Sequence, residues 1–414
     1  SYGFTCRLVS VASVGYNTST LKCPRKTPSI AIQYTAFSAM AACATPPYAR
    51  IYWHGQHTVF GFSSPLGKLP TAAVRSLVQQ HGWREVSRED SNAVPAFTWT
   101  TRRAADFPAS GLSLPLVRQL PQAATACVDD KVLLADVIHR SGLQDICPPT
   151  FTEPSALREA LAASPPTALF FVKHRHGVKG KAVQPMRREA LREWLEVGKH
   201  RGRLGDFAVQ REVAPPALWD ARKFALRAHV LLSARGANEE HVGAWIHRDV
   251  IVIPHSAEHD EGSNAKDVHV SNIGRRHPPP MLTTQLPPEH PAGHDALWPR
   301  LIALTSRCLA AVRDDLLPMS RCSQSTLYSV LAFDLALDAA GTPWLLEVNS
   351  HCALGDGTMA AVEPEVYTRL VADAVGLVVL PALRDLDGAP DGAPVMPVAG
   401  GFVPLAWSYA YQEM

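Results

Sequence analysis

The stretch from Tyr328 to Ser350 places carboxylates inside an otherwise apolar segment, and this constrains the fold more than any other feature of the sequence. It reads YSVLAFDLALDAAGTPWLLEVNS, which predicts two buried strands joined by a tight turn at residues 339–341. With residues 340 and 341 at the tip, Asp334 and Glu347 lie directly opposite each other. Asn349 shares the face of Glu347, because strand side chains alternate between the two faces.

Two carboxylates and an amide oxygen on a buried hairpin are unfavourable unless a cation neutralises them. Mg²⁺ prefers oxygen ligands of this kind and is commonly held by one or two carboxylates together with substrate phosphates. We therefore expect Asp334, Glu347 and Asn349 to bind Mg²⁺ beside a nucleotide. Asp338, at the turn, is expected to be solvated and to have no part in the site.

The composition is that of a soluble protein with two or three domains. The chain has 414 residues, of which 46% are hydrophobic and 19% charged, and its formal net charge is +2. This charge gives no support for a nucleic-acid partner, and no apolar run approaches the roughly 18 residues that a membrane span requires. The eight cysteines include no CxxC pair, which favours a reducing compartment.

The first 50 residues differ in composition from the rest of the chain. They contain five Lys or Arg and no Asp or Glu. Such a bias is typical of an organelle transit peptide, and Ala42–Cys43–Ala44 resembles a signal-cleavage site. A leader without a targeting role explains the same bias, and we favour it over targeting.

Helix and strand patterns alternate from residue 49 onward and predict an α+β fold of mixed α/β character. Helices are expected at 72–81, at 130–141 after a cap at Asp129, and at 154–163, 187–197, 299–317 and 364–376. Strands are expected at 168–173, 222–232 and 242–253.

A basic glycine loop lies within residues 172–183, between two predicted strands. Gly177 and Gly180 allow the backbone to approach a ligand closely, and Lys173, Lys179 and Lys181 carry charge suited to phosphate. The spacing is not that of a P-loop. Taken alone, the loop fits a solvated basic hairpin equally well.

Further cations fall within predicted strands. Lys223 and Arg227 share one face of their strand with Ala225 between them. Cations on a half-buried strand indicate an anionic ligand, and the alternative is an edge strand with solvated charges. Arg248 likewise falls inside a predicted strand, where a core would favour an apolar residue.

Taken in order, these segments resemble the tubulin–tyrosine ligase family, which includes polyglutamylases and glycylases and has the ATP-grasp fold. The resemblance spans about residues 51–380. One departure is Ala225, where the family motif has Asp, so one polar contact to nucleotide or substrate is missing. The matching blocks are TFTEP, FFVKHRHGVKGKAV, AVQREV, RKFALR, IHRD, HVSN and FDLALDAAGTPWLLEVNS, and the last is the most specific.

The resemblance implies ATP and Mg²⁺ as cofactors. It assigns Lys173 and Lys181 to the α- and β-phosphates, Lys179 to the loop that closes over them, and Lys223 to the γ-phosphate. The residues implied for the adenine pocket are Gln210, Arg211, Glu212 and Val213.

At the reacting end, the resemblance assigns Arg227 and Arg248 to the transferring phosphoryl group and the substrate carboxylate. Asn272 would approach the same region. The Mg²⁺ ligands implied are again Asp334, Glu347 and Asn349.

The same resemblance implies an N-terminal small α/β domain followed by an ATP-grasp unit. The predicted divisions are a leader at 1–48, the N-terminal domain at 49–150, a central subdomain with the phosphate loop at 151–232, a C-terminal subdomain with the hairpin at 233–380, and a tail at 381–414.

The implied function is an ATP-dependent ligase that forms an amide or isopeptide bond through an acyl phosphate. Its substrates would be the acidic tail of tubulin and a free Glu, Tyr or Gly. We expect a cytoplasmic, cytoskeleton-associated monomer without nucleic-acid or membrane partners. Two alternatives stay open: a nucleotide- or tubulin-binding member impaired in catalysis by Ala225, and an ATP-grasp ligase with another acceptor.

Overall fold

The computed structural model of the chain describes most residues from 124 to 350 and shorter segments on either side, all within one compact unit, Tyr52–Met414. No helix among them is long and apolar enough to cross a membrane. The described residues are 59–62, 76, 79–80, 84–86, 97–99, 117–120, 124–177, 180, 182–197, 204–235, 242–271, 278–320, 326–350, 364–382 and 400–406. The predicted leader, most of the helix predicted at 72–81, and Lys179, Lys181 and Asn272 lie outside them.

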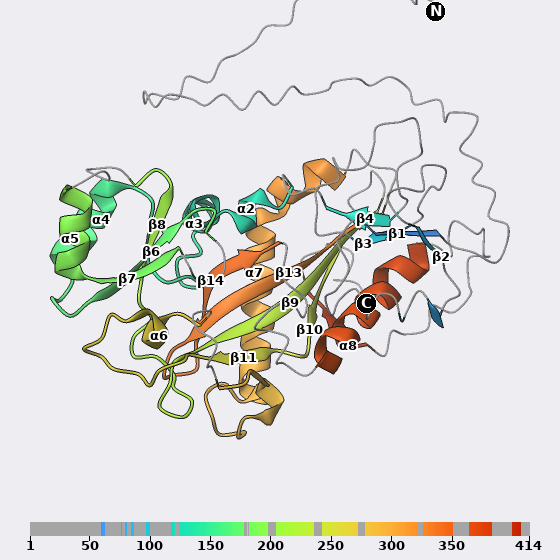
Figure 1. The fold of residues 1–414 in the computed structure, drawn as a ribbon. Coiled ribbons are helices and arrows are strands. Elements are labelled where there is room, and N and C mark those ends of the chain that lie inside the picture. Colours follow the sequence, from blue (N-terminus) through green and yellow to red (C-terminus); the bar gives the residue numbers. More distant parts are fainter. Residues whose placement is uncertain are drawn as a thin grey trace, which may run out of the picture. The chain divides into compact units, whose positions relative to one another are not determined.

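A large mixed sheet forms the centre of the described part (Figure 1). Its longest strands, β9 (Phe224–Arg235) and β13 (Thr326–Leu337), pair antiparallel and set Asp334 opposite Arg227. The order is β12-β11-β9-β13-β4-β3-β1-β2, with β10 and β14 pairing to β9 and β13 and β15 pairing to β10. The other strands are β1 (Val59–Phe62), β2 (Arg84–Val86), β3 (Phe97–Trp99), β4 (Val117–Gln119), β10 (Val242–His247), β11 (Ile251–Pro254), β12 (Met281–Leu282), β14 (Pro343–Asn349) and β15 (Phe402–Pro404).

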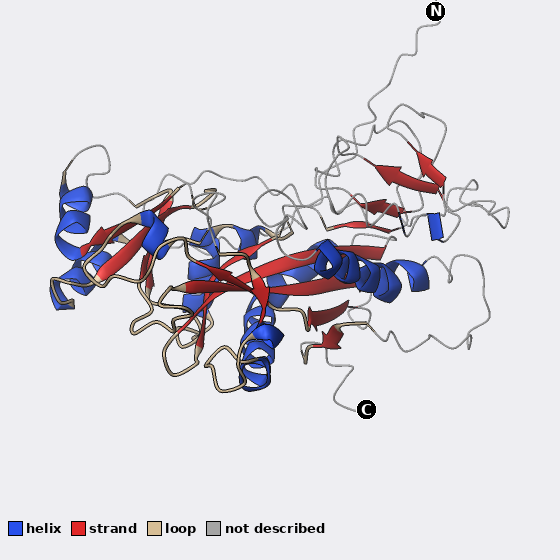
Figure 2. Cartoon of the chain, turned by 60° about the horizontal axis from the view of Figure 1, so that its bottom comes forward, coloured by secondary structure: helices blue, strands red, loops and turns tan. Residues whose placement is uncertain are grey.

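A smaller antiparallel sheet lies beside the long strands of the large one (Figures 1 and 2). Its order is β5-β8-β6-β7, and α4 and α5 pack against it around a core that contains Leu157, Phe170, Leu191 and Val209. The elements are β5 (Thr150–Phe151), α4 (Pro154–Ala163), β6 (Leu169–His174), β7 (Val183–Arg187), α5 (Arg188–Glu196) and β8 (Phe207–Arg211). The helices predicted at 154–163 and 187–197 are confirmed to within one residue.

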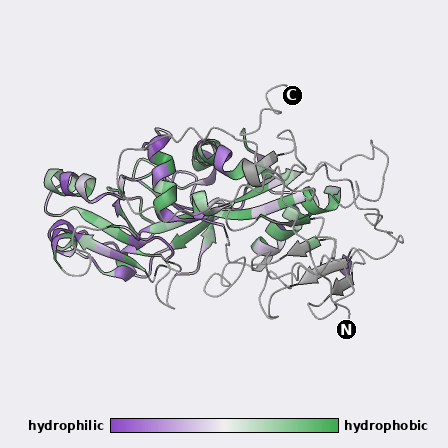
Figure 3. Ribbon diagram, turned by 90° about the horizontal axis from the view of Figure 1, so that it is seen from above, coloured by the Kyte–Doolittle hydropathy of each residue, from purple (hydrophilic) through white to green (hydrophobic). Residues whose placement is uncertain are grey.

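Helices cover both faces of the large sheet. The helix α7 (His294–Ser320) buries Leu301 and Leu309 in one cluster with Leu226, and α8 (Pro364–Ala374) buries Leu370 in another with Leu231. Since 226 and 231 differ by an odd number, they lie on opposite faces of β9. In Figure 3 the central strands are mostly green, as expected for strands buried on both sides. The described short helices are α2 (Ala126–Asp129), α3 (Lys131–Arg140), α6 (Lys266–His269), the 3₁₀ helix η4 (Thr283–Gln285) and the π-helix η6 (Val375–Val379).

The predicted hairpin is β13 and β14, and its loop comprises residues 339–341 as expected. Gly341 takes a left-handed φ of 79°, which suits glycine. A regular ladder from this loop would set Asp334 opposite Leu346. A β-bulge at Leu346 shifts the register by one residue and brings Glu347 opposite Asp334. The predicted pairing of the two carboxylates is therefore confirmed, but a bulge produces it and not the turn alone.

Several predicted boundaries need correction. The cap of α3 is Asp130, whose Oδ1 accepts from the N–H groups of Val132 and Leu133, whereas Asp129 accepts from the N–H of Ser350. The strand predicted at 242–253 is two strands, with Arg248 between them.

The two sheets also bear on the predicted domains. The boundary at residue 232 falls inside β9, and β4 extends the large sheet by pairing in parallel with β13. The change from the small to the large sheet therefore precedes residue 224. The division of the chain into functional domains stays a prediction.

Asp338 fixes the hairpin loop and is not simply solvated, which corrects the prediction. Its Oδ1 accepts from the N–H groups of Ala340 at 3.0 Å and Thr342 at 2.8 Å, and its Oδ2 accepts from the indole N–H of Trp344 at 3.1 Å. A short acceptor that bonds to nearby backbone N–H groups is a common means of closing a turn.

We expect Asp338→Ala to lower the free energy of unfolding by about 1–2 kcal/mol, because three donors lose their acceptor. Asp338→Asn keeps an oxygen for the backbone and should lose less. Urea unfolding measures both, with Asp314→Ala, an exposed position on α7, as a control within about 0.5 kcal/mol of the parent. Equal losses for Asp338→Ala and Asp314→Ala would contradict the assignment.

Candidate functional site

A cleft between the small sheet and the large sheet contains most of the predicted site residues that the structure describes. It encloses about 970 Å³ of empty space, open solvent at its mouth included. Strand β8 and the segment after it contribute Gln210, Arg211, Glu212 and Val213, as the resemblance implies. The hairpin contributes Asp334, Leu346 and Glu347, and β6 and the residue before β9 contribute Lys173 and Lys223.

Lys173 connects the two sheets across the floor of the cleft. Its Nζ donates to Oε1 of Gln210 at 2.6 Å and to the carbonyl of the bulged Leu346 at 3.3 Å. Gln210 in turn donates to Oγ1 of Thr150 at 3.1 Å. Burial lowers the pKa of Lys173, and Glu347 opposes part of that shift. The bulge therefore does two things: it aligns the carboxylates and supplies a carbonyl to Lys173.

Asp334 is held in a buried, two-point ion pair. Nε and Nη2 of Arg227 each lie 2.8 Å from one of its oxygens, and Nδ2 of Asn349 lies 3.0 Å from Oδ2. Arg227 and Asp334 are both about 7% exposed. Burial raises the pKa of Asp334, and Arg227 offsets only part of this. The pair is geometrically strong, but either member alone would be costly at this depth.

Glu347 is paired with Lys131, a residue that the sequence analysis did not select. The distance from Lys131 Nζ to Glu347 Oε2 is 3.2 Å, and the same Nζ donates to the carbonyl of Gly177 at 3.0 Å. Burial alone would raise the pKa of Glu347, but Lys131 and Lys173 outweigh it and lower that pKa. The sequence feature that could have drawn attention to Lys131 is its position directly after the capping Asp130, at the first residue of α3.

The loop that contains Gly177 is also tied to the start of α3. Nε of Arg175 donates to Oδ2 of Asp130 at 2.8 Å, while the other oxygen of Asp130 caps the helix. Through Lys131, the described part of the basic loop therefore lies near Glu347. The placement of Lys179 and Lys181 stays a prediction.

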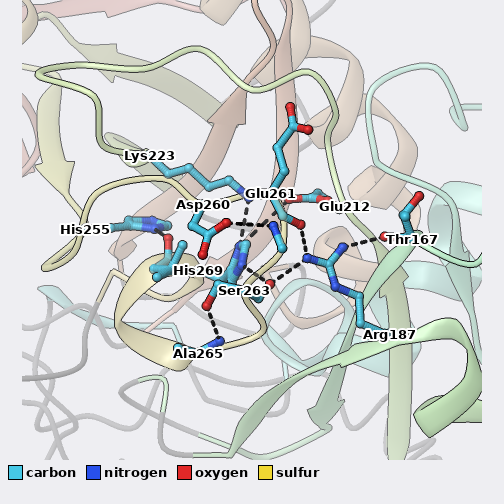
Figure 4. Close-up of polar contacts among 12 residues, drawn as sticks. Thr167, Arg187, Glu212, Lys223, His255, Asp260, Glu261, Ser263, Ala265 and His269 are labelled. Carbon is cyan, nitrogen blue, oxygen red and sulfur yellow. Dashed lines mark hydrogen bonds and ion pairs between the residues drawn. The ribbon is translucent and has the colours of Figure 1, made fainter.

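Lys223 lies against Glu212 (Figure 4). Its ammonium forms an ion pair with Glu212 and donates to Nδ1 of His269 at 2.8 Å. Because the carbonyl of Ser263 can only accept, Nε2 of His269, 3.0 Å away, carries the proton and Nδ1 is the acceptor. Burial and Lys223 lower the pKa of His269 to about 4, so the ring is neutral near pH 7.

Lys223 immediately precedes β9 and lies four positions before Arg227, which corresponds to about 13 Å between their Cα atoms in an extended chain. Its ammonium is held by the linker residue Glu212. The assignment of Lys223 to the γ-phosphate stays a prediction.

Arg187 ties the segment between β11 and α6 to the small sheet (Figure 4). Its guanidinium donates to the carbonyls of Thr167, Glu261 and Ser263, the last at 2.6 Å. Because β11 belongs to the large sheet and Arg187 ends β7 in the small one, these bonds bridge the two sheets at the Lys223 end of the cleft.

Ala225 faces the cleft between the two charged positions of β9, and its surroundings are apolar. Its cross-strand partner is Ile253, and the two residues are 6% and 4% exposed. The position at which the family motif has Asp therefore lacks both the carboxylate and a polar partner on β11.

Arg248 does not line the cleft, contrary to its predicted role inside a ligand-binding strand. It is exposed between β10 and β11, and its backbone N–H donates to the carbonyl of Gly401 at 2.8 Å. A role for Arg248 in binding the phosphoryl group or the substrate carboxylate stays a prediction.

The hairpin donors fit a Mg²⁺ ion. Asp334 and Glu347 face each other in the cleft, and rotation of the Asn349 amide would present its oxygen, which differs little from the NH₂ group in size. Across the described residues, no group of three His, Cys, Asp or Glu is arranged to hold a metal. A third ligand would therefore come from Asn349, water or a bound phosphate.

We expect Arg227→Met to lower the free energy of unfolding by about 3–5 kcal/mol near pH 7, because Asp334 loses its buried partner. Burial raises the pKa of a lone carboxyl, so Asp334 takes up a proton as the pH falls and the loss should shrink toward pH 5. Urea unfolding at both pH values tests this. Arg227→Met/Asp334→Asn is the matched control and should recover most of the loss, whereas a loss independent of pH would argue against the assignment.

Comparison with known proteins identifies one family. Residues 283–386, about a quarter of the chain, match the Tubulin-tyrosine ligase family, and this segment contains the hairpin with Asp334, Glu347 and Asn349. No curated protein matches the chain. The family in general comprises ATP-dependent ligases that act on tubulin and use ATP and Mg²⁺. The match agrees with the resemblance found in the sequence, and the mixed helices and antiparallel sheets of the described residues are consistent with an α+β fold.

Proposed function

We propose that the protein is an ATP-dependent ligase that joins a free amino acid to a carboxylate of an acidic polypeptide tail, with tubulin as the acceptor. The observation that carries this proposal is the arrangement of one cleft. The linker segment 210–213 and the paired carboxylates of the hairpin line the same cleft, and the buried Lys173 bonds to both sides through Gln210 and the carbonyl of Leu346. The four residue steps from Lys223 to Arg227 span about 13 Å, which suits an extended nucleoside triphosphate.

The nucleoside would lie against the linker segment 210–213, where exposed backbone groups can bond to a purine edge. Glu212 and Lys223 would stand beside it as an ion pair, and Nδ1 of His269 accepts from Lys223. The triphosphate would extend toward Lys173, which lies under the bulge, with Lys179 and Lys181 of the basic loop proposed to close over it. Lys131 adds a further cation at the hairpin end.

The proposed reaction has two steps. An acceptor carboxylate attacks the γ-phosphorus, ADP leaves, and an acyl phosphate forms. The amine of the amino acid then attacks the acyl carbon, phosphate leaves, and the amine loses a proton as the amide bond forms. No covalent enzyme intermediate is required, because the chain contributes positioning and electrostatic stabilisation.

Each charged residue has a part in this chemistry. Asp334, Glu347 and Asn349 would hold Mg²⁺, which would neutralise phosphate charge during transfer. Arg227, fixed by Asp334, would face the charge that develops on the transferring phosphoryl group. The exposed Arg248 would attract the acidic acceptor. Since the net charge of the chain is only +2, this attraction has to be local.

A second candidate function is nucleotide and tubulin binding without turnover. Ala225 and its apolar partner Ile253 favour it, because a polar contact to the ligand is missing there. Protection by ATP against thermal unfolding without ADP release would support this candidate, more so if Ala225→Asp restored release. A third possibility is a ligase with an acceptor other than tubulin. Comparing the rate of amino-acid transfer to tubulin with the rate to other acidic peptides distinguishes it from the main proposal. For the main proposal, the site of action is the cytoplasm, at microtubules.

The test is incubation of the purified protein with ATP, Mg²⁺, tubulin or tail peptides and a mixture of Glu, Tyr and Gly, followed by mass spectrometry. We expect a mass increase of one or more amino-acid residues on an acidic tail, with stoichiometric ADP. Glu347→Gln should lower the rate by about 100-fold or more, because a charged ligand for the metal is lost.

Glu159→Gln, an exposed position on α4, is the matched control and should retain the parental rate. Transfer by Glu347→Gln at that rate would refute the metal assignment. Absence of modification and of ADP with every acceptor, while ATP still binds, would refute ligation and leave the binding function.

A further inference from the structure

Both carboxylates that would hold the metal already have a counter-ion from the chain. Asp334 is bound at two points by Arg227, at 2.8 Å for each oxygen, and Glu347 is bound by Lys131 at 3.2 Å. Asn349 adds an amide N–H to Asp334 at 3.0 Å. Arg227 and Lys131 therefore already offset the two carboxylates, and Lys173 is a further cation near Glu347.

The two counter-ions differ in how firmly they are held. Arg227 lies inside β9 and makes a fork-shaped contact, which is the strongest form of this ion pair. Lys131 reaches Glu347 from the first residue of α3 by a single longer contact and bonds also to the carbonyl of Gly177 in the basic loop. Lys131 is thus the counter-ion more readily exchanged, and its second partner lies in the segment that would receive phosphates.

We propose that Lys131 and Arg227 are internal counter-ions that keep free divalent cations from the hairpin carboxylates, so that the metal enters only together with a nucleoside triphosphate. This rests on the proposed function and concerns the order in which its ligands bind. Lys131 is a positioning residue in this account, because it holds Glu347 and the basic loop in place until phosphates replace the carboxylate as its partner.

Charge balance gives the physical reason. A free divalent cation would have to displace an ammonium from Glu347 and would face a site with no net negative charge. Its electrostatic binding energy would therefore be small. A triphosphate adds several negative charges beside Lys131 and Lys173. Both lysines then have an anionic partner, Glu347 is released, and the metal has carboxylate and phosphate oxygens together.

Titration of Mn²⁺ into the nucleotide-free protein, with free Mn²⁺ measured by electron paramagnetic resonance, tests the proposal. The parent should leave the free Mn²⁺ signal nearly unchanged until ATP is added. Lys131→Met, at a helix position that tolerates Met, should bind Mn²⁺ without nucleotide, at least about tenfold more tightly than the parent. Lys131→Arg keeps the charge and should behave like the parent. Adding Glu347→Gln to Lys131→Met should abolish the gain.

Three results would overturn the proposal: nucleotide-free parent that binds Mn²⁺ as tightly as it does with ATP, Lys131→Met without a gain, or a gain that survives Glu347→Gln. If Lys131→Met does not fold, the Mn²⁺ affinity of the parent with ATP is compared with its affinity without ATP, and this comparison decides. Failure of ATP to bind would refute the proposed function instead, and a Mn²⁺ gain in Lys131→Met would support the counter-ion account even then.

Discussion

The ion pair between Arg227 and Asp334 is the interaction on which the site depends. It joins β9 to β13, the two longest strands of the large sheet, at the point where the sheet meets the cleft. On the other side of β13, the β-bulge at Leu346 of β14 brings Glu347 opposite Asp334. The buried charges are tolerable only because each has a partner, so the fold of the hairpin and the electrostatics of the cleft form one arrangement.

Much of this arrangement follows from local patterns. An apolar run with carboxylates at matching distances from a Gly-containing turn predicts a hairpin with its acids opposed, and the structure has that pairing. The helices at α4 and α5 follow from spacing and from Pro154 at the first helical position. Cations at alternate positions of β9 likewise predict that Lys223, Ala225 and Arg227 share one face, and Ala225 does face the cleft beside Lys223.

What the patterns do not predict depends on contacts between distant segments. The bulge at Leu346 has no sequence signal, and the partner of its carbonyl, Lys173, is 173 residues away. Lys131 reads as an ordinary helix residue until α3 is seen to begin beside Glu347. The partner of Lys223, Glu212, lies eleven residues earlier in the chain, and no local pattern predicts their contact. Arg248 fits a strand by composition, but the chain turns there and exposes it.

We propose above all that the cleft binds a nucleoside triphosphate with its base at the linker segment and its phosphates at the hairpin. A crystal structure with a non-hydrolysable ATP analogue and Mn²⁺, using the anomalous signal of the metal, tests it most directly. The account predicts an anomalous peak between Asp334 and Glu347, with the purine against residues 210–213 and Lys223 beside the sugar. A nucleotide bound outside the cleft, or one reversed within it, would contradict the account.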